Sequence, residues 1–205
     1  MEIVPLLCYR GEWRISGTKE GRPLDFYENR EENRLQAAIG WIVDVIVMVL
    51  LAAFAVYCFG TRVQMRGSSM RPALESGDVV LINRLAYDLG SPKRFDIAAF
   101  ARDDSSFNIR RVIGLPGETV QIIEGMIYIN GEPLAAEEES LCSASMAGLA
   151  EYPVELGEDE YFLLGDNRES SEDSRFESIG NVSRSQMAGK VWLRIAPASG
   201  FGWVR

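Results

Sequence analysis

The longest apolar run in the chain lies near its N-terminus and predicts a single membrane-spanning helix. Residues 37–60 are apolar apart from Asp44, and they follow a polar segment of mixed charge, residues 1–36. As an α-helix these residues would reach about 36 Å, which exceeds the roughly 30 Å hydrocarbon core of a bilayer. Trp41 and Tyr57 stand near its two ends, where interfacial aromatic residues belong. A buried helix of a soluble domain is the alternative, but such helices seldom run so far with one charged residue.

After residue 60 the apolar positions fall into short runs separated by turn residues, which predicts β-strands. The predicted strands are 78–82, 96–100, 119–123, 126–129, 161–164 and 191–195. A short helical turn is indicated only around residues 83–89, and residues 134–152 are expected to form an acidic solvated loop or a small insertion. The predicted fold class is therefore mainly β: one N-terminal transmembrane helix, followed by an antiparallel β-sheet domain over residues 61–205.

Composition excludes several chemistries. The chain of 205 residues has a net charge of −9 and no basic block, so no nucleic-acid partner is expected. It contains no histidine, which rules out a Ser-His or Cys-His nucleophile pair and any zinc site that needs imidazole, and we expect no metal or cofactor. Cys58 lies within the predicted membrane span, and Cys8 and Cys142 lie on opposite sides of it, so no intramolecular disulfide is expected.

The first candidate for chemistry is a serine turn seven residues beyond the apolar run. Gly67 gives a flexible residue and a backbone N–H before Ser69, and Pro72 restrains the backbone after it. Such a turn can expose the Ser69 hydroxyl and direct backbone donors at a developing oxyanion. Alone, this short pattern is equally typical of a structural turn.

Two further segments give the serine turn its meaning. The serine turn itself, residues 67–74, contains Ser-Met-x-Pro-x-Leu. The first further segment, 110–117, reads Arg-Arg-x-x-Gly-x-Pro-Gly, and the second, 165–175, contains Gly-Asp-Asn followed by Ser-x-Asp-Ser-Arg. Together, and beside the predicted anchor, they make the chain resemble the type I signal peptidases, which are Ser/Lys-dyad endopeptidases. The resemblance runs from about residue 41 to the end, while residues 1–36 match nothing known to us.

The resemblance implies a role for each matched residue. Ser69 falls at the position of the nucleophile, Gly67 and Ser69 at the oxyanion hole, and Ser171 at the serine that orients the base. Supporting positions are matched by Met70, Pro72, Asp173 and Arg175, and the last two are expected to pair. Preproteins would be cut after small residues at Ala-x-Ala sites, through an acyl-enzyme on Ser69.

Arg110 stands where the family has its general-base lysine. A desolvated lysine can become neutral and take a proton from serine, whereas a guanidinium stays protonated and has no lone pair to accept one. The other lysines are Lys19, Lys93 and Lys190, and none falls at a dyad position. The alternatives to an active peptidase are therefore a silenced homologue that binds signal peptides, or an engineered inactive form. Self-cleaving repressors with Ser-Lys sites share a related β fold, but the anchor argues against that class.

The resemblance also implies location and partners. Residues 1–36 would be cytoplasmic and residues 61–205 extracytoplasmic, in a single-pass protein of the plasma membrane. Lysine and arginine flank both ends of the apolar run, so charge does not decide this orientation. The expected partners are preprotein signal peptides, the lipid bilayer and the secretion translocase.

Overall fold

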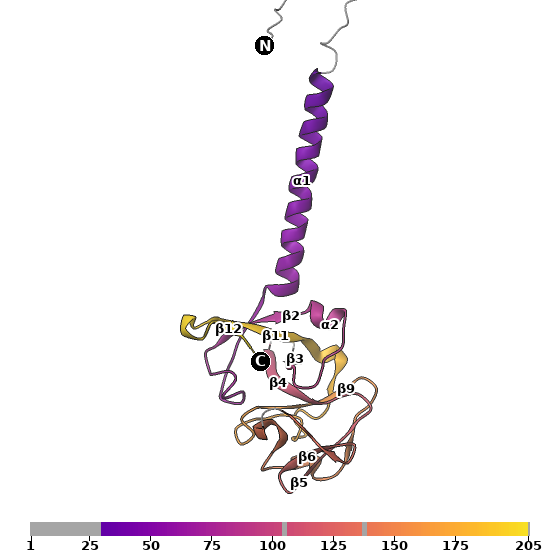
Figure 1. Cartoon of the computed structure of the whole chain (residues 1–205), viewed down its shortest axis with the longest axis vertical. Coiled ribbons are helices and arrows are strands. Elements are labelled where there is room, and N and C mark those ends of the chain that lie inside the picture. The colour runs from indigo at the N-terminus through magenta and orange to yellow at the C-terminus, as the bar shows by residue number, and fades with distance from the viewer. Residues whose placement is uncertain (1–29, 104–105, 137–138, 205) are drawn as a thin grey trace, which may run out of the picture. The chain divides into compact units, whose positions relative to one another are not determined.

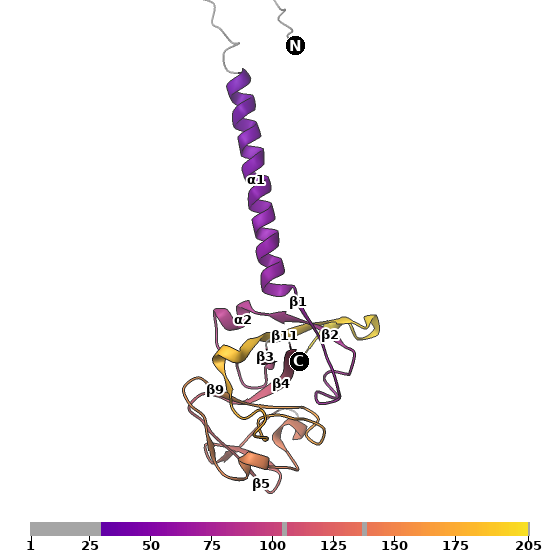
Figure 2. The same ribbon diagram turned by 180° about the vertical axis from the view of Figure 1, so that it is seen from behind.

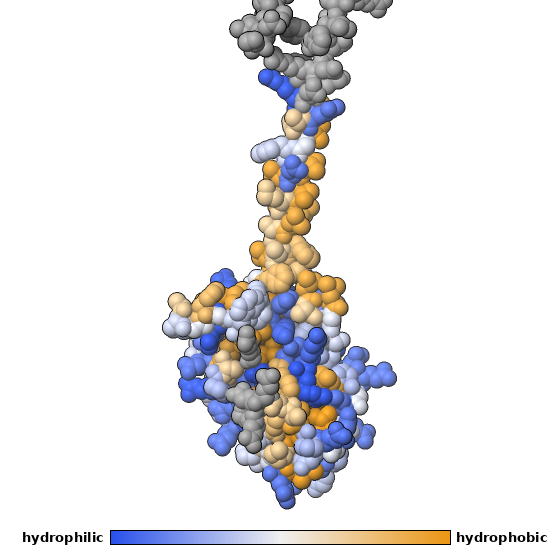
Figure 3. Space-filling model, in the orientation of Figure 1, coloured by the Kyte–Doolittle hydropathy of each residue, from blue (hydrophilic) through white to orange (hydrophobic). Residues whose placement is uncertain are grey.

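The computed structural model describes residues 30–103, 106–136 and 139–204. Helix α1 spans Arg30–Phe59, so it begins before the predicted start at residue 37 and ends one residue before the predicted end. Among the described residues it is the one helix long and apolar enough to cross a membrane, over Arg34–Phe59. Its large apolar side chains are exposed, and they cover most of the helix surface in Figure 3. Cys8 and most of the predicted polar leader lie outside the described residues.

The remainder of the chain is mainly antiparallel β, as the sequence predicts. Within the described residues the strands form an eight-stranded sheet and a four-stranded sheet. In the first, the order is β1-β2-β11-β3-β4-β9-β10, with β12 paired to β11, and in the second it is β7-β6-β5-β8. Figures 1 and 2 show β5, in the smaller sheet, at the opposite end of this domain from β2.

The larger sheet is built from segments far apart in the sequence. Its strands are β1 (Thr61–Gln64), β2 (Val79–Asn83), β3 (Ile97–Asp103), β4 (Ser106–Gly114), β9 (Glu160–Leu164), β10 (Val182–Ser183), β11 (Met187–Ala196) and β12 (Gly202–Trp203). Short helical turns connect them: α2 (Leu85–Asp88), η3 (Arg184–Gln186) and η4 (Ala198–Gly200). Alternate side chains bury apolar surface on both faces, so that Ile97 and Ala99 belong to one core cluster and Ala98 and Phe100 to another.

The smaller sheet closes over a third core cluster. Its strands are β5 (Thr119–Ile123), β6 (Met126–Ile129), β7 (Glu132–Pro133) and β8 (Val154–Glu155), with the 3₁₀ turns η1 (Glu139–Cys142) and η2 (Gly148–Glu151) beside them. The β5–β6 hairpin has the predicted boundaries, because Glu124 and Gly125 both adopt the positive φ that such a turn requires.

Strand β4 was not predicted, although its neighbours were. It carries Arg110 and Arg111 side by side, and two adjacent charges break the alternation by which strands are recognised. Both arginines are nevertheless buried, because polar groups of other loops meet them. The strand that carries Arg110 therefore escaped prediction, as did the short strands β1, β7, β8, β10 and β12.

Residues 134–152 are only in part the solvated loop that was expected, since four of them are buried in a core cluster. Leu134, Cys142, Ala144 and Ala150 are buried in the core of the smaller sheet. The small residues allow this close packing, and the backbone is held by Ala144 N–H donating to Gly125 O and Leu149 N–H donating to Arg175 O. Glu137 and Glu138, which suggested an acidic loop, lie outside the described residues. Cys58 and Cys142 are free, buried thiols.

The contact of η2 with Arg175 predicts an unequal cost at two glycines of positive φ. A Cβ at Gly148 would overlap the carbonyl oxygen of Arg175 and approach its Cβ to 2.9 Å, whereas a Cβ at Gly131 would meet nothing within 4 Å. Gly131→Ala should lower the free energy of unfolding by about 1 kcal/mol, from backbone strain alone. Gly148→Ala should lower it by about 2–4 kcal/mol, because the backbone must also move. Chemical denaturation of both variants measures the difference, and equal costs would contradict the packing of η2 on Arg175.

Candidate active site

The serine turn connects β1 to β2 and is anchored by two buried apolar side chains. Met70 and Leu74 are fully buried in the core beneath the larger sheet, and Leu74 N–H donates to Met70 O at 2.8 Å. These anchors leave Ser69 only 6% exposed but place Gly67 on the surface, with φ +79° and open space around it. The turn therefore holds one hydroxyl below an accessible rim.

The loop at residues 165–175 is hydrogen-bonded to this serine turn. Asn167 N–H donates to Ser69 O at 3.0 Å, and the Asn167 side chain donates to Ser68 O at 3.2 Å. At the exposed edge, the hydroxyls of Ser68 and Ser170 lie 2.9 Å apart. The backbone of Ser69 and its neighbour Ser68 are thus held by hydrogen bonds to a segment about one hundred residues away.

Arg110 points at the serine hydroxyl. Its Nη1 donates to Ser69 Oγ at 2.9 Å and to Ile109 O at 2.6 Å, while Nε and Nη2 both donate to Glu172 O, at 3.0 and 2.6 Å. The residue is only 7% exposed. In this contact Ser69 Oγ accepts a hydrogen bond from a cation, which is the reverse of what a general base must do.

Ser171 lies near the backbone of Ser69, across Gly165. It is 6% exposed, and its Oγ has no hydrogen-bond partner among the described residues. Gly165 explains the close approach, because a Cβ there would overlap the Ser171 side chain and lie 2.6 Å from Ser69 O. A buried hydroxyl without a partner usually marks a site that lacks a group or a solvent molecule.

Two buried ion pairs support this arrangement. Asp173 and Arg175, the pair expected from the motif, lie 2.8 Å apart with fully buried side chains, and Asp173 also accepts from Gly165 N–H at 3.0 Å. Arg111 makes two bonds of 2.7 Å to Asp166 and one of 2.9 Å to Phe95 O. The sequence offered Arg111 and Asp166 only as motif positions, and nothing in it indicated their pairing.

Arg168 is a buried cation that the sequence did not single out. It donates to the carbonyl oxygens of Gly165, Ser143 and Leu141, at 2.8, 2.6 and 2.9 Å. Desolvation by burial lowers the pKa of its guanidinium to about 10, against a smaller opposing effect of Asp166. It occupies an unspecified position of the motif, so no residue-type signal distinguished it from a surface arginine.

Neither lysine in the described part of the chain hydrogen-bonds to Ser69. Lys190 Nζ pairs with Asp96 at 2.6 Å, while Lys93 is exposed and its backbone N–H donates to the same aspartate. Across the part of the chain that the structure describes, Arg110 is the one side chain that hydrogen-bonds to Ser69 Oγ.

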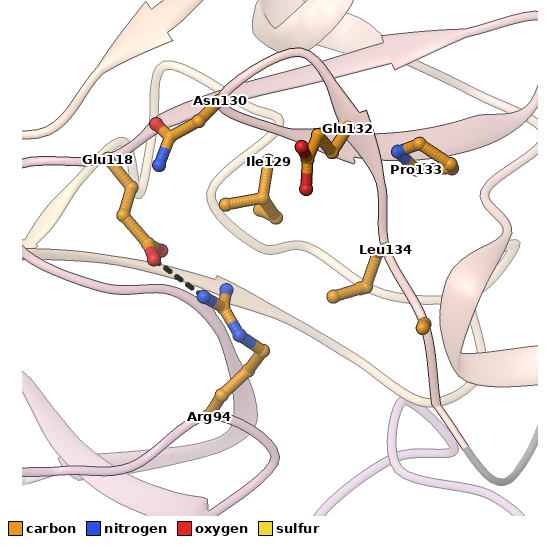
Figure 4. A pocket seen from close by; sticks show the side chains of 8 residues that line it. Arg94, Glu118, Ile129, Asn130, Glu132, Pro133 and Leu134 are labelled. Carbon is orange, nitrogen blue, oxygen red and sulfur yellow. Dashed lines mark hydrogen bonds and ion pairs between the residues drawn. The ribbon is translucent and has the colours of Figure 1, made fainter.

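A separate cavity of about 330 Å³ lies at the edge of the smaller sheet (Figure 4). Arg94 and Glu118 form an ion pair of 2.6 Å across one side, and Ile129 and Leu134 give it an apolar wall. Its lining includes none of the residues predicted for the active site.

Comparisons with known proteins identify the family of this chain. A family model described as "Signal peptidase, peptidase S26" matches residues 38–196. This chain belongs to the signal peptidase family. By that resemblance it is a serine endopeptidase of the class that cleaves signal peptides.

Several relatives have similar sequences. The signal peptidase I of Bacillus caldolyticus is 36% identical over 173 residues, which cover 80% of this chain and 92% of that protein. A probable signal peptidase I-2 of Synechocystis is 36% identical over 143 residues, covering 66% and 62%. A solved structure of a signal peptidase I from Enterococcus faecalis V583 has 32% identity and a TM-score of 0.39, and covers 48% of this chain and 95% of its own.

The Asp173–Arg175 pair predicts a large loss of stability when one partner loses its charge. Asp173→Asn leaves Arg175 buried with an uncompensated charge, so the free energy of unfolding should fall by about 3–5 kcal/mol. The exposed Glu169, in the same loop, gives a matched control, since Glu169→Gln should change stability by less than about 0.5 kcal/mol. Thermal and chemical denaturation of the two variants measures both values. Similar values for the two would show that the buried pair does not hold the loop.

Proposed function

We propose that this chain binds the signal-peptide segments of exported preproteins and that Arg110 keeps it from cutting them efficiently. The observation that carries the proposal is the hydrogen bond of 2.9 Å from Arg110 Nη1 to Ser69 Oγ. Membership of the signal peptidase family supports the binding of signal peptides. The guanidinium of Arg110 supports the loss of proton transfer from Ser69.

The acid–base chemistry follows from the identity of one side chain. Attack by Ser69 requires that its proton pass to a neutral acceptor as the oxygen approaches the scissile carbonyl. Arg110 stays protonated at working pH and offers only donors. Its two bonds to Glu172 O also hold it in place, so that a nearby carboxylate cannot easily replace it beside Ser69.

Binding would use the extended form of the peptide. A peptide strand that pairs with an exposed edge gains main-chain hydrogen bonds, and shallow pockets then select its alternate side chains. Strand β1 lies at the end of the larger sheet and leads into the Ser69 turn, so an exposed backbone runs toward the reactive position. Small residues at the first and third positions before the cut, of Ala-x-Ala type, would fit below the surface rim at Gly67.

A second candidate function is that of a working endopeptidase at these Ala-x-Ala sites. It is favoured by the intact serine turn, in which Ser69 is buried, anchored by Met70 and Leu74, and bonded to the 165–175 loop. This function requires a base other than Arg110. Lys190 has the amine that such a base would need, but it is paired with Asp96.

A cleavage assay separates the two functions. The purified full chain in detergent should leave a preprotein intact at mildly alkaline pH, whereas Arg110→Lys should cut it at a rate at least about 100-fold higher, because a desolvated amine can accept the serine proton. Adding Ser69→Ala to that variant should abolish the gained cleavage. Appearance of mature protein on gels gives the rates. Efficient cleavage by the unaltered chain would establish the second function.

We propose further that the chain is a single-pass protein of the plasma membrane, with residues 1–36 in the cytoplasm and residues 61–205 outside, where preproteins emerge from the translocase. The apolar helix α1 and the family membership support this orientation.

Topology is open to a direct measurement. Protease added to intact cells whose outer layers have been removed should digest the domain of residues 61–205, while a tag placed before residue 30 stays protected. Digestion of the tag with protection of the domain would reverse the orientation. Detergent-permeabilised cells, in which both parts are accessible, provide the control.

A further inference from the structure

Arg110 differs from a neutral base in a second respect: it brings a permanent positive charge to the reactive position. Nη1 lies 2.9 Å from Ser69 Oγ, and both residues are more than nine-tenths buried. A charge that is desolvated in this way interacts with a ligand charge far more strongly than it would in water. The site should therefore distinguish ligands that carry a negative charge next to Ser69 Oγ from ligands that are neutral there.

A cut peptide places a negative charge there and an uncut peptide does not. Hydrolysis turns the scissile carbonyl, the group that Ser69 Oγ would attack, into the C-terminal carboxylate of the released segment. An uncut chain at the same place offers a neutral carbonyl and an N–H. A guanidinium forms charge-assisted hydrogen bonds with carboxylates, and these are roughly twice as strong as bonds to neutral acceptors.

We propose that the site around Ser69 and Arg110 is a receptor for peptides that end in a free C-terminal carboxylate after small residues, in preference to uncut chains. This inference rests on the proposed function, since it assigns the class of ligand to the same site. The chain would then hold peptides of the kind that signal-peptide cleavage releases.

Two features of the site fit a carboxylate. Glu172 O accepts from Nε and Nη2 of the guanidinium, and Ile109 O accepts one N–H of Nη1, which directs the other Nη1 N–H to Ser69 Oγ. A carboxylate would replace this neutral hydroxyl as the acceptor of that N–H. The Ser171 hydroxyl is buried beside Ser69 and has no partner among the described residues, so it can donate to a second carboxylate oxygen. The net charge of −9 opposes general attraction of anions, so any preference for acids must come from the site itself.

The test compares two peptides that differ in one group. A fluorescent peptide ending in Ala-x-Ala is prepared with a free carboxylate and, separately, with a C-terminal amide, and its binding to the full chain in detergent is followed by anisotropy. The acid should bind at least about tenfold more tightly than the amide, because it alone forms the charge-assisted bond. Arg110→Met should lower acid affinity to that of the amide, while Arg66→Gln, at an exposed arginine near the turn, should leave the preference unchanged.

Each result decides the matter. Equal affinity of acid and amide for the unaltered chain overturns the inference and leaves the proposed binding function in place, and this comparison needs no variant that might misfold. Absence of binding by either peptide overturns both. Acetate that competes with the acid peptide at similar concentration overturns recognition of a peptide terminus, since the site would then take any small carboxylate. A preference for the acid that persists in Arg110→Met also overturns it.

Discussion

The buried pair of Asp173 and Arg175 is the constraint on which the site depends. Asp173 neutralises Arg175 and also accepts from the backbone of Gly165, and Arg175 in turn reaches the carbonyl oxygens of Arg168 and Met146. A buried charge that keeps a full set of partners fixes geometry well, because every alternative arrangement leaves a polar group unsatisfied. The loop held in this way presents Asn167 to the serine turn and Ser171 to the reactive position.

On this fixed frame, one side chain decides the chemistry. The same pocket that would desolvate a lysine, and so help it to lose its proton, contains Arg110, whose charge persists at any working pH. The carbonyl oxygen of Glu172 and the hydroxyl of Ser69 accommodate that charge. The residue in contact with Ser69 Oγ is thus a cation that only donates hydrogen bonds, which is why binding and cleavage are separate questions for this chain.

The sequence predicted the β domain and the grouping of Ser69, Arg110 and Ser171, but for different reasons. The strands followed from alternation and turn residues, as in the β5–β6 hairpin, whereas the grouping followed from family motifs, since Ser69 and Arg110 meet only through the tertiary fold. Strand β4 was missed because Arg110 and Arg111 look like surface residues until Glu172 O and Asp166 are seen to meet them. Arg168 and the buried part of residues 134–152 were missed likewise, because composition does not reveal which polar or small residues find partners inside.

Arg168 has one more effect, on how the two sheets hold together. Its guanidinium ties Leu141 and Ser143, next to the smaller sheet, to Gly165 at the end of β9 in the larger one. Dissolved ions screen charges that face water but hardly reach one that is enclosed by protein. The junction between the sheets should therefore keep its form in concentrated salt as well as in dilute buffer.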